Sequence, residues 1–137
     1  MQKAIVIREY GSSSVLKMEK INVGEPGIGE LLVQHTAIGV HFHDVYVRTG
    51  LYKTLNLPGI PGLEAVGVIL KIGPEVSEFK PGDRVGYISS EYGAYASHRI
   101  LNEKLAVKIP DLISDELIAT NFSRAITVQM LIKQVTR

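Results

Sequence analysis

The chain has 137 residues, which is enough for one domain with a real core. Its formal net charge is +1, so it lacks the surplus of basic residues that binding to nucleic acid or an anionic membrane would require. It contains no cysteine, which excludes disulfides, thiolate nucleophiles and every cysteine-ligated zinc site. No apolar run approaches the roughly 18 to 20 residues that span a bilayer, and the N-terminal apolar stretch is too short for a secretory signal, so we expect a cytoplasmic protein.

The first forty residues predict three strands that are separated by turns. Lys3 to Arg8 and Val15 to Val23 have strand-like patterns, and Leu31 to Gly39 follows the turn-rich segment Glu25 to Glu30. Short strands at this spacing, with no helical periodicity before about residue 110, indicate a barrel or a sandwich.

The next segment, Val40 to Tyr52, concentrates two histidines, an aspartate, an arginine and two tyrosines. We expect a loop with a short helical turn that ends at Gly50. So many polar and aromatic side chains are unusual for a mere connector, and the segment is therefore the first place to look for a site.

Glycines and prolines alternate from Pro58 to Val85, which predicts tight bends between short strands. Within this stretch, Ala65 to Ile72 reads as a largely buried strand and Pro81 to Arg84 as a β-turn. Glu64 is a single carboxylate among small and apolar residues, and it must be paired if it is buried.

The rest of the chain predicts more strands and then helix. Glu91 to Ser97, Arg99 to Asn102 and Ala106 to Pro110 are the expected strands. Ser114 can cap a helix whose first turn carries Asp115 and Glu116, and a second helical stretch is expected from Arg124 to Val135.

A family pattern overlies the glycine-rich stretch. The signature of medium-chain dehydrogenases and reductases has the spacing of Gly62, Glu64, Gly67, Gly73 and Val76, and a Gly-Asp-Arg-Val turn follows at residues 82 to 85. Leu63 departs from the signature, which has histidine there. An unrelated β-barrel with similar turns is the alternative interpretation.

Over essentially its whole length the chain resembles the N-terminal part of a zinc-independent quinone oxidoreductase, related to zeta-crystallin. The resemblance implies a mainly β fold in which residues 1–110 form an irregular GroES-like β-barrel, the catalytic domain. It also implies that residues 111–137 form C-terminal helices leading toward a nucleotide-binding domain.

The glycines at 59, 62, 67 and 73 do not form the Gly-x-Gly-x-x-Gly motif of a dinucleotide site. We therefore predict that a Rossmann domain is absent from this chain. The resemblance implies NADP(H) as the cofactor of the parent family, but we expect none to bind this chain tightly.

Zinc is not expected either. The positions of the three zinc ligands in zinc-dependent relatives correspond here to His41, Leu63 and Ser123. A single imidazole does not make a tetrahedral zinc site.

The resemblance also assigns site residues. Tyrosines at the positions of Tyr46 and Tyr52 line the cleft near the nicotinamide and the quinone, together with the residue at position 41, and Thr127 matches a threonine beside the nicotinamide. Position 41 is commonly asparagine in the family; His41 could hydrogen-bond a quinone oxygen or donate a proton to it. A surface or satisfied His41, and packing roles for Tyr46, Tyr52 and Thr127, are the alternatives.

Other polar residues have weaker claims. His43 is a lesser candidate, while His35 and His98 lie in predicted strands and are expected to be structural. For Glu64 the resemblance implies a structural or electrostatic role behind the site, paired with an Arg or Lys.

These patterns predict the N-terminal catalytic domain of an NADPH-dependent quinone oxidoreductase, inactive on its own. A non-enzymatic barrel remnant that serves as an interaction module is one alternative. The catalytic domain of an enoyl or alkenal reductase is another. Apolar side chains within 111–137 also predict self-association through that segment.

Overall fold

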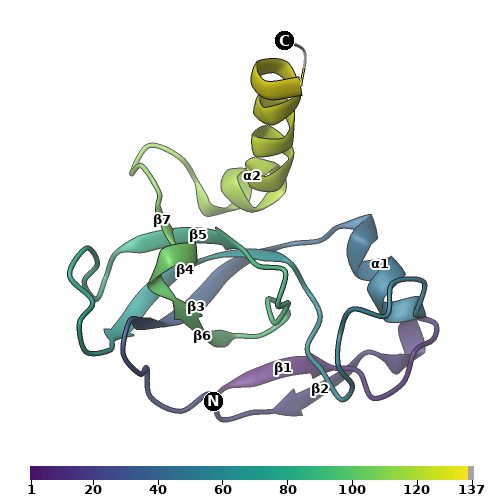
Figure 1. Cartoon of the computed structure of the whole chain (residues 1–137). Coiled ribbons are helices and arrows are strands. Elements are labelled where there is room, and N and C mark those ends of the chain that lie inside the picture. The colour runs from purple at the N-terminus through teal and green to yellow at the C-terminus, as the bar shows by residue number, and fades with distance from the viewer. Residues whose placement is uncertain (136–137) are drawn as a thin grey trace.

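A computed structural model describes residues 1–135 of the chain. All strand pairings in this part are antiparallel: β1 with β2 in a small sheet, and a five-stranded sheet in the order β6-β3-β4-β5-β7. Figure 1 shows the curved sheets with α1 at one end and α2 standing on one side. The strands are β1 (Lys3–Val6), β2 (Lys17–Lys20), β3 (Glu30–Gly39), β4 (Glu64–Ile72), β5 (Arg84–Ile88), β6 (His98–Asn102) and β7 (Val107–Lys108), and the helices are α1 (Phe42–Thr49) and α2 (Asp115–Met130).

The long strand β3 curls the larger sheet because its pairing with β4 shifts register twice, at Leu32/Val33 and at His35/Ala37. Each such irregularity bends the strand and increases its twist. The enclosed core consists of buried residues from four strands and the segment before β6: Leu31, Val33, Ala65, Ile69, Val85, Tyr87, Ala94 and Leu101. The prediction of a mainly β, irregular barrel is confirmed.

Helix α1 ends where the sequence predicted. Gly50 follows it with φ +81°, in the left-handed region that glycine adopts cheaply. Val47 on the inner face of α1 packs with Ile7, Leu55 and Tyr92 in a second buried cluster. This packing fixes α1 against the barrel.

Helix α2 is anchored at its first turn. The Ser114 hydroxyl accepts a hydrogen bond from Leu117 N at 3.2 Å, and Arg84 of β5 pairs with Asp115 at 2.6 Å. The Thr36 hydroxyl also donates to Asp115, at 2.6 Å. The hydrogen bond from Thr36 and the Arg84 guanidinium hold the pKa of Asp115 below its usual value.

The prediction of two separate helical stretches after Pro110 is wrong. One α-helix runs from Asp115 to Met130 and continues as a π-helical turn, η3 (Leu131–Val135), because no Gly or Pro interrupts it. No helix within residues 1–135 is both long and apolar enough to cross a bilayer. The division into 1–110 and 111–137 stays a prediction, and residues 136–137 lie outside the described part.

The predicted strand from Glu91 to Ser97 is also wrong. Tyr92 and Gly93 both have positive φ, +62° and +97°, which an extended strand cannot accommodate. The backbone there bonds to the glycine- and proline-rich loop instead, as in Gly93 N to Ile60 O at 2.9 Å. A strand that was not predicted, β5, follows the turn at residues 81–84.

Candidate active site

Glu64, the first residue of β4, is the buried centre of a polar cluster that joins three elements. Its side chain is 2% exposed. Its Oε1 lies 2.5 Å from His41 Nε2, at the start of α1, and 3.1 Å from the Ser123 hydroxyl of α2. Its Oε2 accepts from the Ser123 backbone N–H at 3.1 Å. The expected Arg or Lys partner of Glu64 is thus wrong: the partner is His41.

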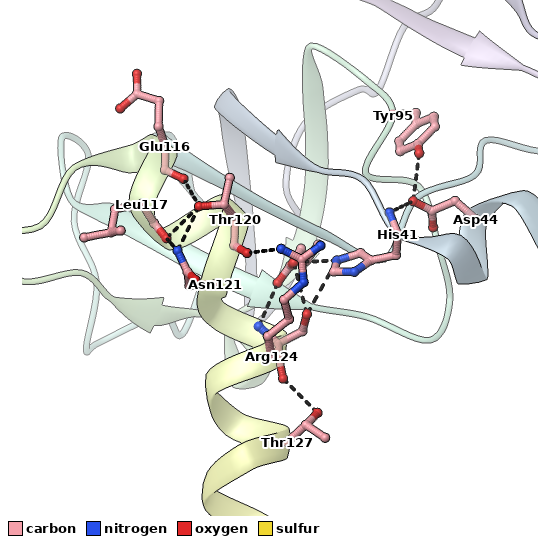
Figure 2. Close-up of polar contacts among 11 residues, drawn as sticks. His41, Asp44, Tyr95, Glu116, Leu117, Thr120, Asn121, Arg124 and Thr127 are labelled. Carbon is pink, nitrogen blue, oxygen red and sulfur yellow. Dashed lines mark hydrogen bonds and ion pairs between the residues drawn. The ribbon is translucent and has the colours of Figure 1, made fainter.

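His41 is fixed from its backbone side by the N-terminus of α1. The Asp44 carboxylate accepts from His41 N at 2.9 Å and from the Tyr95 hydroxyl at 2.7 Å. Burial, followed by the bond to Asp44, raises the pKa of Tyr95. Figure 2 shows the His41 side chain reaching from this point toward α2.

Gly39 makes room for the approach of α2 to Glu64. A Cβ on Gly39 would lie 2.6 Å from the Ala119 carbonyl oxygen of α2 and 2.6 Å from Glu64 Cγ. No side chain fits into that space, so the last residue of β3 is part of the site's construction.

Serine, histidine and glutamate also make up some hydrolytic triads, but the connectivity here differs. A triad needs the carboxylate on one ring nitrogen and the serine on the other. Here Glu64 Oε1 and the Ser123 hydroxyl both lie near Nε2, at 2.5 and 3.5 Å. The ring nitrogen that would have to take the serine proton already contacts the carboxylate, and the Ser123 hydroxyl donates to Glu64 instead, so the cluster is not a nucleophilic triad.

The predicted tyrosines form a separate, more exposed group. Tyr46 on α1 and Tyr52 after it are 37% and 43% exposed, and their ring centroids lie 5.4 Å apart, edge to face. His43 packs against Tyr52 at 5.4 Å and bonds through Nε2 to the Tyr92 hydroxyl at 3.1 Å. Tyr92 is buried with positive φ, a strained conformation for an aromatic residue.

The structure thus does not bring the four predicted site residues together. Tyr46 and Tyr52 touch each other, whereas His41 belongs to the Glu64 cluster. Thr127 is exposed on α2, one turn beyond Ser123, and its hydroxyl donates to Ser123 O at 2.9 Å. Sequence reasoning named Ser123 only as the residue at one of the relatives' zinc-ligand positions, together with His41, and gave it no chemical role. Its spacing of four residues from Thr127 puts both on one face of α2.

His35 forms a second polar network inside the barrel. Its Nδ1 lies 2.6 Å from Ala96 O and its Nε2 2.9 Å from the Tyr87 hydroxyl, and Arg99 lies over the Tyr87 ring at 5.0 Å. Burial lowers the pKa of His35 to about 4 despite the bond to Ala96 O, with smaller contributions from Arg99 and His98, and burial raises that of Tyr87.

Two further observations limit the site's chemistry. Residues 1–135 contain no group of three or more His, Cys, Asp or Glu side chains that could hold a metal ion; the zinc-free state stays a prediction. A hollow of about 450 Å³ lies between β1, β3 and residues 95–97, and none of the four predicted site residues lines it.

The chain matches a known domain family, and it is similar in sequence to longer proteins. Residues 27–111 match the alcohol dehydrogenase GroES-like domain. A quinone oxidoreductase of Pseudomonas aeruginosa is 39% identical over 98% of this chain and 41% of its own length. The quinone oxidoreductase 1 of Escherichia coli is 38% identical over the same shares, and a 2-haloacrylate reductase of Burkholderia is 34% identical over 98% and 42%.

Solved structures agree with this likeness. An Escherichia coli quinone oxidoreductase in complex with NADPH superposes with a TM-score of 0.93 at 35% identity, covering 97% of this chain and 41% of that one. A quinone oxidoreductase of Pseudomonas syringae gives a TM-score of 0.92 at 38% identity, covering 98% and 42%. The chain thus spans about two fifths of the length of these proteins.

Proposed function

Because the chain belongs to the alcohol dehydrogenase GroES-like domain family, we propose that it is the substrate-binding and proton-donating part of an NADPH-dependent quinone oxidoreductase. The cytoplasmic location, the absence of zinc and the inactivity of this part alone belong to the same proposal. The observation that carries it is the contact between His41 and the buried Glu64 carboxylate, in a chain whose long relatives include quinone oxidoreductases.

Reduction of a quinone to a hydroquinone takes a hydride and a proton. NADPH, when bound, supplies the hydride and leaves as NADP⁺. The proton must come from a group within hydrogen-bond reach of a quinone oxygen. His41 is 15% exposed at its side chain and lies 2.5 Å from the Glu64 carboxylate, which suits it to that task.

The exposed tyrosines supply the surface for a flat ring. Tyr46 and Tyr52 meet edge to face, so each offers a ring face or edge to a planar substrate at little entropic cost. We assign the binding of the substrate ring to these two side chains.

The described residues fit the nicotinamide end of NADPH and little else of it. The Thr127 hydroxyl donates its one hydrogen bond to Ser123 O. Its oxygen still has lone pairs that can accept a hydrogen bond from a carboxamide N–H. A pyrophosphate site needs a glycine-rich turn between a strand and a helix in a parallel unit, whereas the pairings within residues 1–135 are antiparallel. We therefore expect NADPH to bind this chain weakly.

Quinone binding is tested by NMR with duroquinone, whose fully substituted ring resists addition by protein nucleophiles. We expect chemical-shift changes at Tyr46, Tyr52 and His41, and weaker binding in Tyr52→Ala. Ile28→Ala is the control, because Ile28 is an exposed apolar side chain in the segment before β3. Shift changes confined to other parts of the barrel would refute the assignment of the ring site.

Turnover is tested by following NADPH absorbance with duroquinone. The contacts available here must offset an entropic cost of association of roughly 4 to 15 kcal/mol, and we expect no saturable rate above the uncatalysed one. Saturable turnover that Tyr52→Ala abolishes would show that the barrel binds the nucleotide unaided.

A reductase for an activated carbon–carbon double bond is the second candidate, favoured by the similarity to the 2-haloacrylate reductase. Such a substrate carries a carboxylate, so 2-chloroacrylate would compete with duroquinone for binding. If 2-chloroacrylate binds at His41 and duroquinone does not, this second assignment replaces the first.

We also propose self-association through residues 111–137. Apolar side chains on the far half of α2 and in η3 are exposed, among them Ile126, Val128, Met130 and Leu131, and such surface tends to be covered. Light scattering should show a mass that rises with concentration; a strict monomer at high concentration would contradict the proposal.

A further inference from the structure

We propose that Glu64 and Ser123 are positioning residues for His41: together they hold the proton on Nε2 and leave Nδ1 as the ring nitrogen that serves the substrate. This inference deepens the proposed function, because it rests on His41 as the proton donor. It assigns a role to Ser123, on a different element from the other two residues.

The hydrogen-bond inventory around Glu64 determines which group carries the protons. The Ser123 backbone N–H can only donate, and it points at Oε2 at 3.1 Å. The Ser123 hydroxyl donates to Oε1 at 3.1 Å. With two donors from Ser123 already on it, we take Glu64 as a carboxylate that only accepts, which makes the remaining neighbour of Oε1, His41 Nε2 at 2.5 Å, an N–H donor.

Ser123 contributes to this arrangement in two ways. Its backbone and hydroxyl together neutralise part of the buried charge on Glu64, which would otherwise be costly at 2% exposure. Its hydroxyl oxygen also lies 3.5 Å from Nε2, which limits how far the ring can swing. Because Arg84 and Thr36 anchor the first turn of α2 through Asp115, Ser123 is itself held in place.

The consequence for the reaction is a defined path for one proton. In the proposed path the proton that reaches the quinone oxygen leaves from Nδ1, while the Nε2–H stays on Glu64. Of the other charged groups drawn in Figure 2, Asp44 accepts from the His41 backbone N–H, and the Nη1 of Arg124 on α2 donates to Thr120 O at 2.7 Å.

The inference is tested on the chain alone, without quinone or NADPH. Long-range ¹H–¹⁵N spectra of the ¹⁵N-histidine-labelled protein report which ring nitrogen carries the proton, and His41→Asn assigns the His41 signals. We expect His41 at neutral pH to be protonated on Nε2, with a downfield N–H signal that exchanges slowly with water. Ser123→Ala should speed that exchange about tenfold, the factor that loss of one ordinary hydrogen bond gives.

Two further variants and an internal control complete the test. Ser123→Thr keeps the hydroxyl and should restore slow exchange, while Glu64→Gln should move the His41 N–H signal upfield because a neutral acceptor is weaker. His43, bonded to the Tyr92 hydroxyl, should not change in any variant. If Glu64→Gln does not fold, Ser123→Ala decides alone.

The inference is overturned if wild-type His41 carries its proton only on Nδ1, or if a folded Ser123→Ala protein exchanges at the wild-type rate. Neither outcome depends on whether the chain binds a quinone. Conversely, failure of the duroquinone experiment would remove the proposed function and leave the tautomer result standing.

Discussion

The two histidine networks of this barrel share a residue type and differ in the charge of the partner. His35 meets two neutral groups, the Ala96 carbonyl and the Tyr87 hydroxyl, and burial lowers its pKa to about 4. His41 meets the carboxylate of Glu64. The first arrangement favours a neutral ring, whereas the second gives the ring an acidic partner within hydrogen-bond distance.

The difference teaches that burial alone does not define a structural histidine. Both side chains are partly buried and both are hydrogen-bonded, yet only His41 has an acidic partner and a position at the joint of three elements. The partner's charge, rather than the degree of burial, separates the chemical candidate from the packing residue.

The largest expected effect comes from removing the carboxylate. Glu64→Ala leaves His41 and the Ser123 N–H without their acceptor in a buried site, and we expect a loss of about 3 to 5 kcal/mol in the free energy of unfolding. Tyr87→Phe removes only a neutral hydroxyl from His35 and should cost about 1 kcal/mol. Urea denaturation compares the two; equal losses would show that the charged network is not special.

The next effect is a pH dependence that belongs to His35. Its pKa falls from 6.5 in the unfolded chain to about 4 in the folded one, so the unfolded state binds more protons between these values. Stability should therefore fall by about 3 kcal/mol as the pH drops from 6.5 to 4. The measurement is the difference between urea curves of the wild type and His35→Gln, which should shift by about 3 kcal/mol in favour of the variant as the pH drops from 6.5 to 4; a pH-independent difference would contradict it.

A smaller loss should follow from filling the gap at Gly39. In Gly39→Ala the new methyl group would press on the Ala119 carbonyl and on Glu64, 2.6 Å away, and we expect a cost of about 1 to 3 kcal/mol. Gly86→Ala, on β5 under the same helix, is the control, since its Cβ would meet nothing closer than 3.4 Å. A thermal melt in which the two variants match would show that α2 can move away without cost.

The smallest expected effect is that of Ser123→Ala on stability. It removes one hydroxyl bond to Glu64, worth about 1 kcal/mol, but places a better helix former in α2, which recovers about half of that. We expect a net change below about 1 kcal/mol in urea denaturation. A loss of several kcal/mol in the free energy of unfolding would mean that Ser123 mainly stabilises the fold and does not specifically orient His41.

Local signals in the sequence predicted the barrel and its turns well. Gly50 ends α1, Ser114 caps α2, and Gly62 has φ +102° beside Tyr95, all of which depend on a few neighbouring residues. The strand expected at residues 91–97 failed because the positive φ of Tyr92, a residue that rarely adopts it, carries no local sequence signal.

The site was only half predictable for a related reason. His41, Tyr46 and Tyr52 lie close together in sequence, so their density marked the segment. The contact of Glu64 with His41 and Ser123 joins residues that are 23 and 59 positions apart, and no periodicity encodes it. An apolar context around Glu64 signalled the need for a partner without identifying it.

The anchoring of α2 has a consequence for how the helix opens in time. Its contacts to the barrel lie between Asp115 and Ser123, whereas residues 124–135 are all exposed. Amide hydrogen exchange should therefore show a step at Ser123, with slow amides before it and rapidly exchanging ones after it. Thr127 lies just past that step, so a nucleotide that binds there must order a part of the helix that lies beyond these contacts with the barrel.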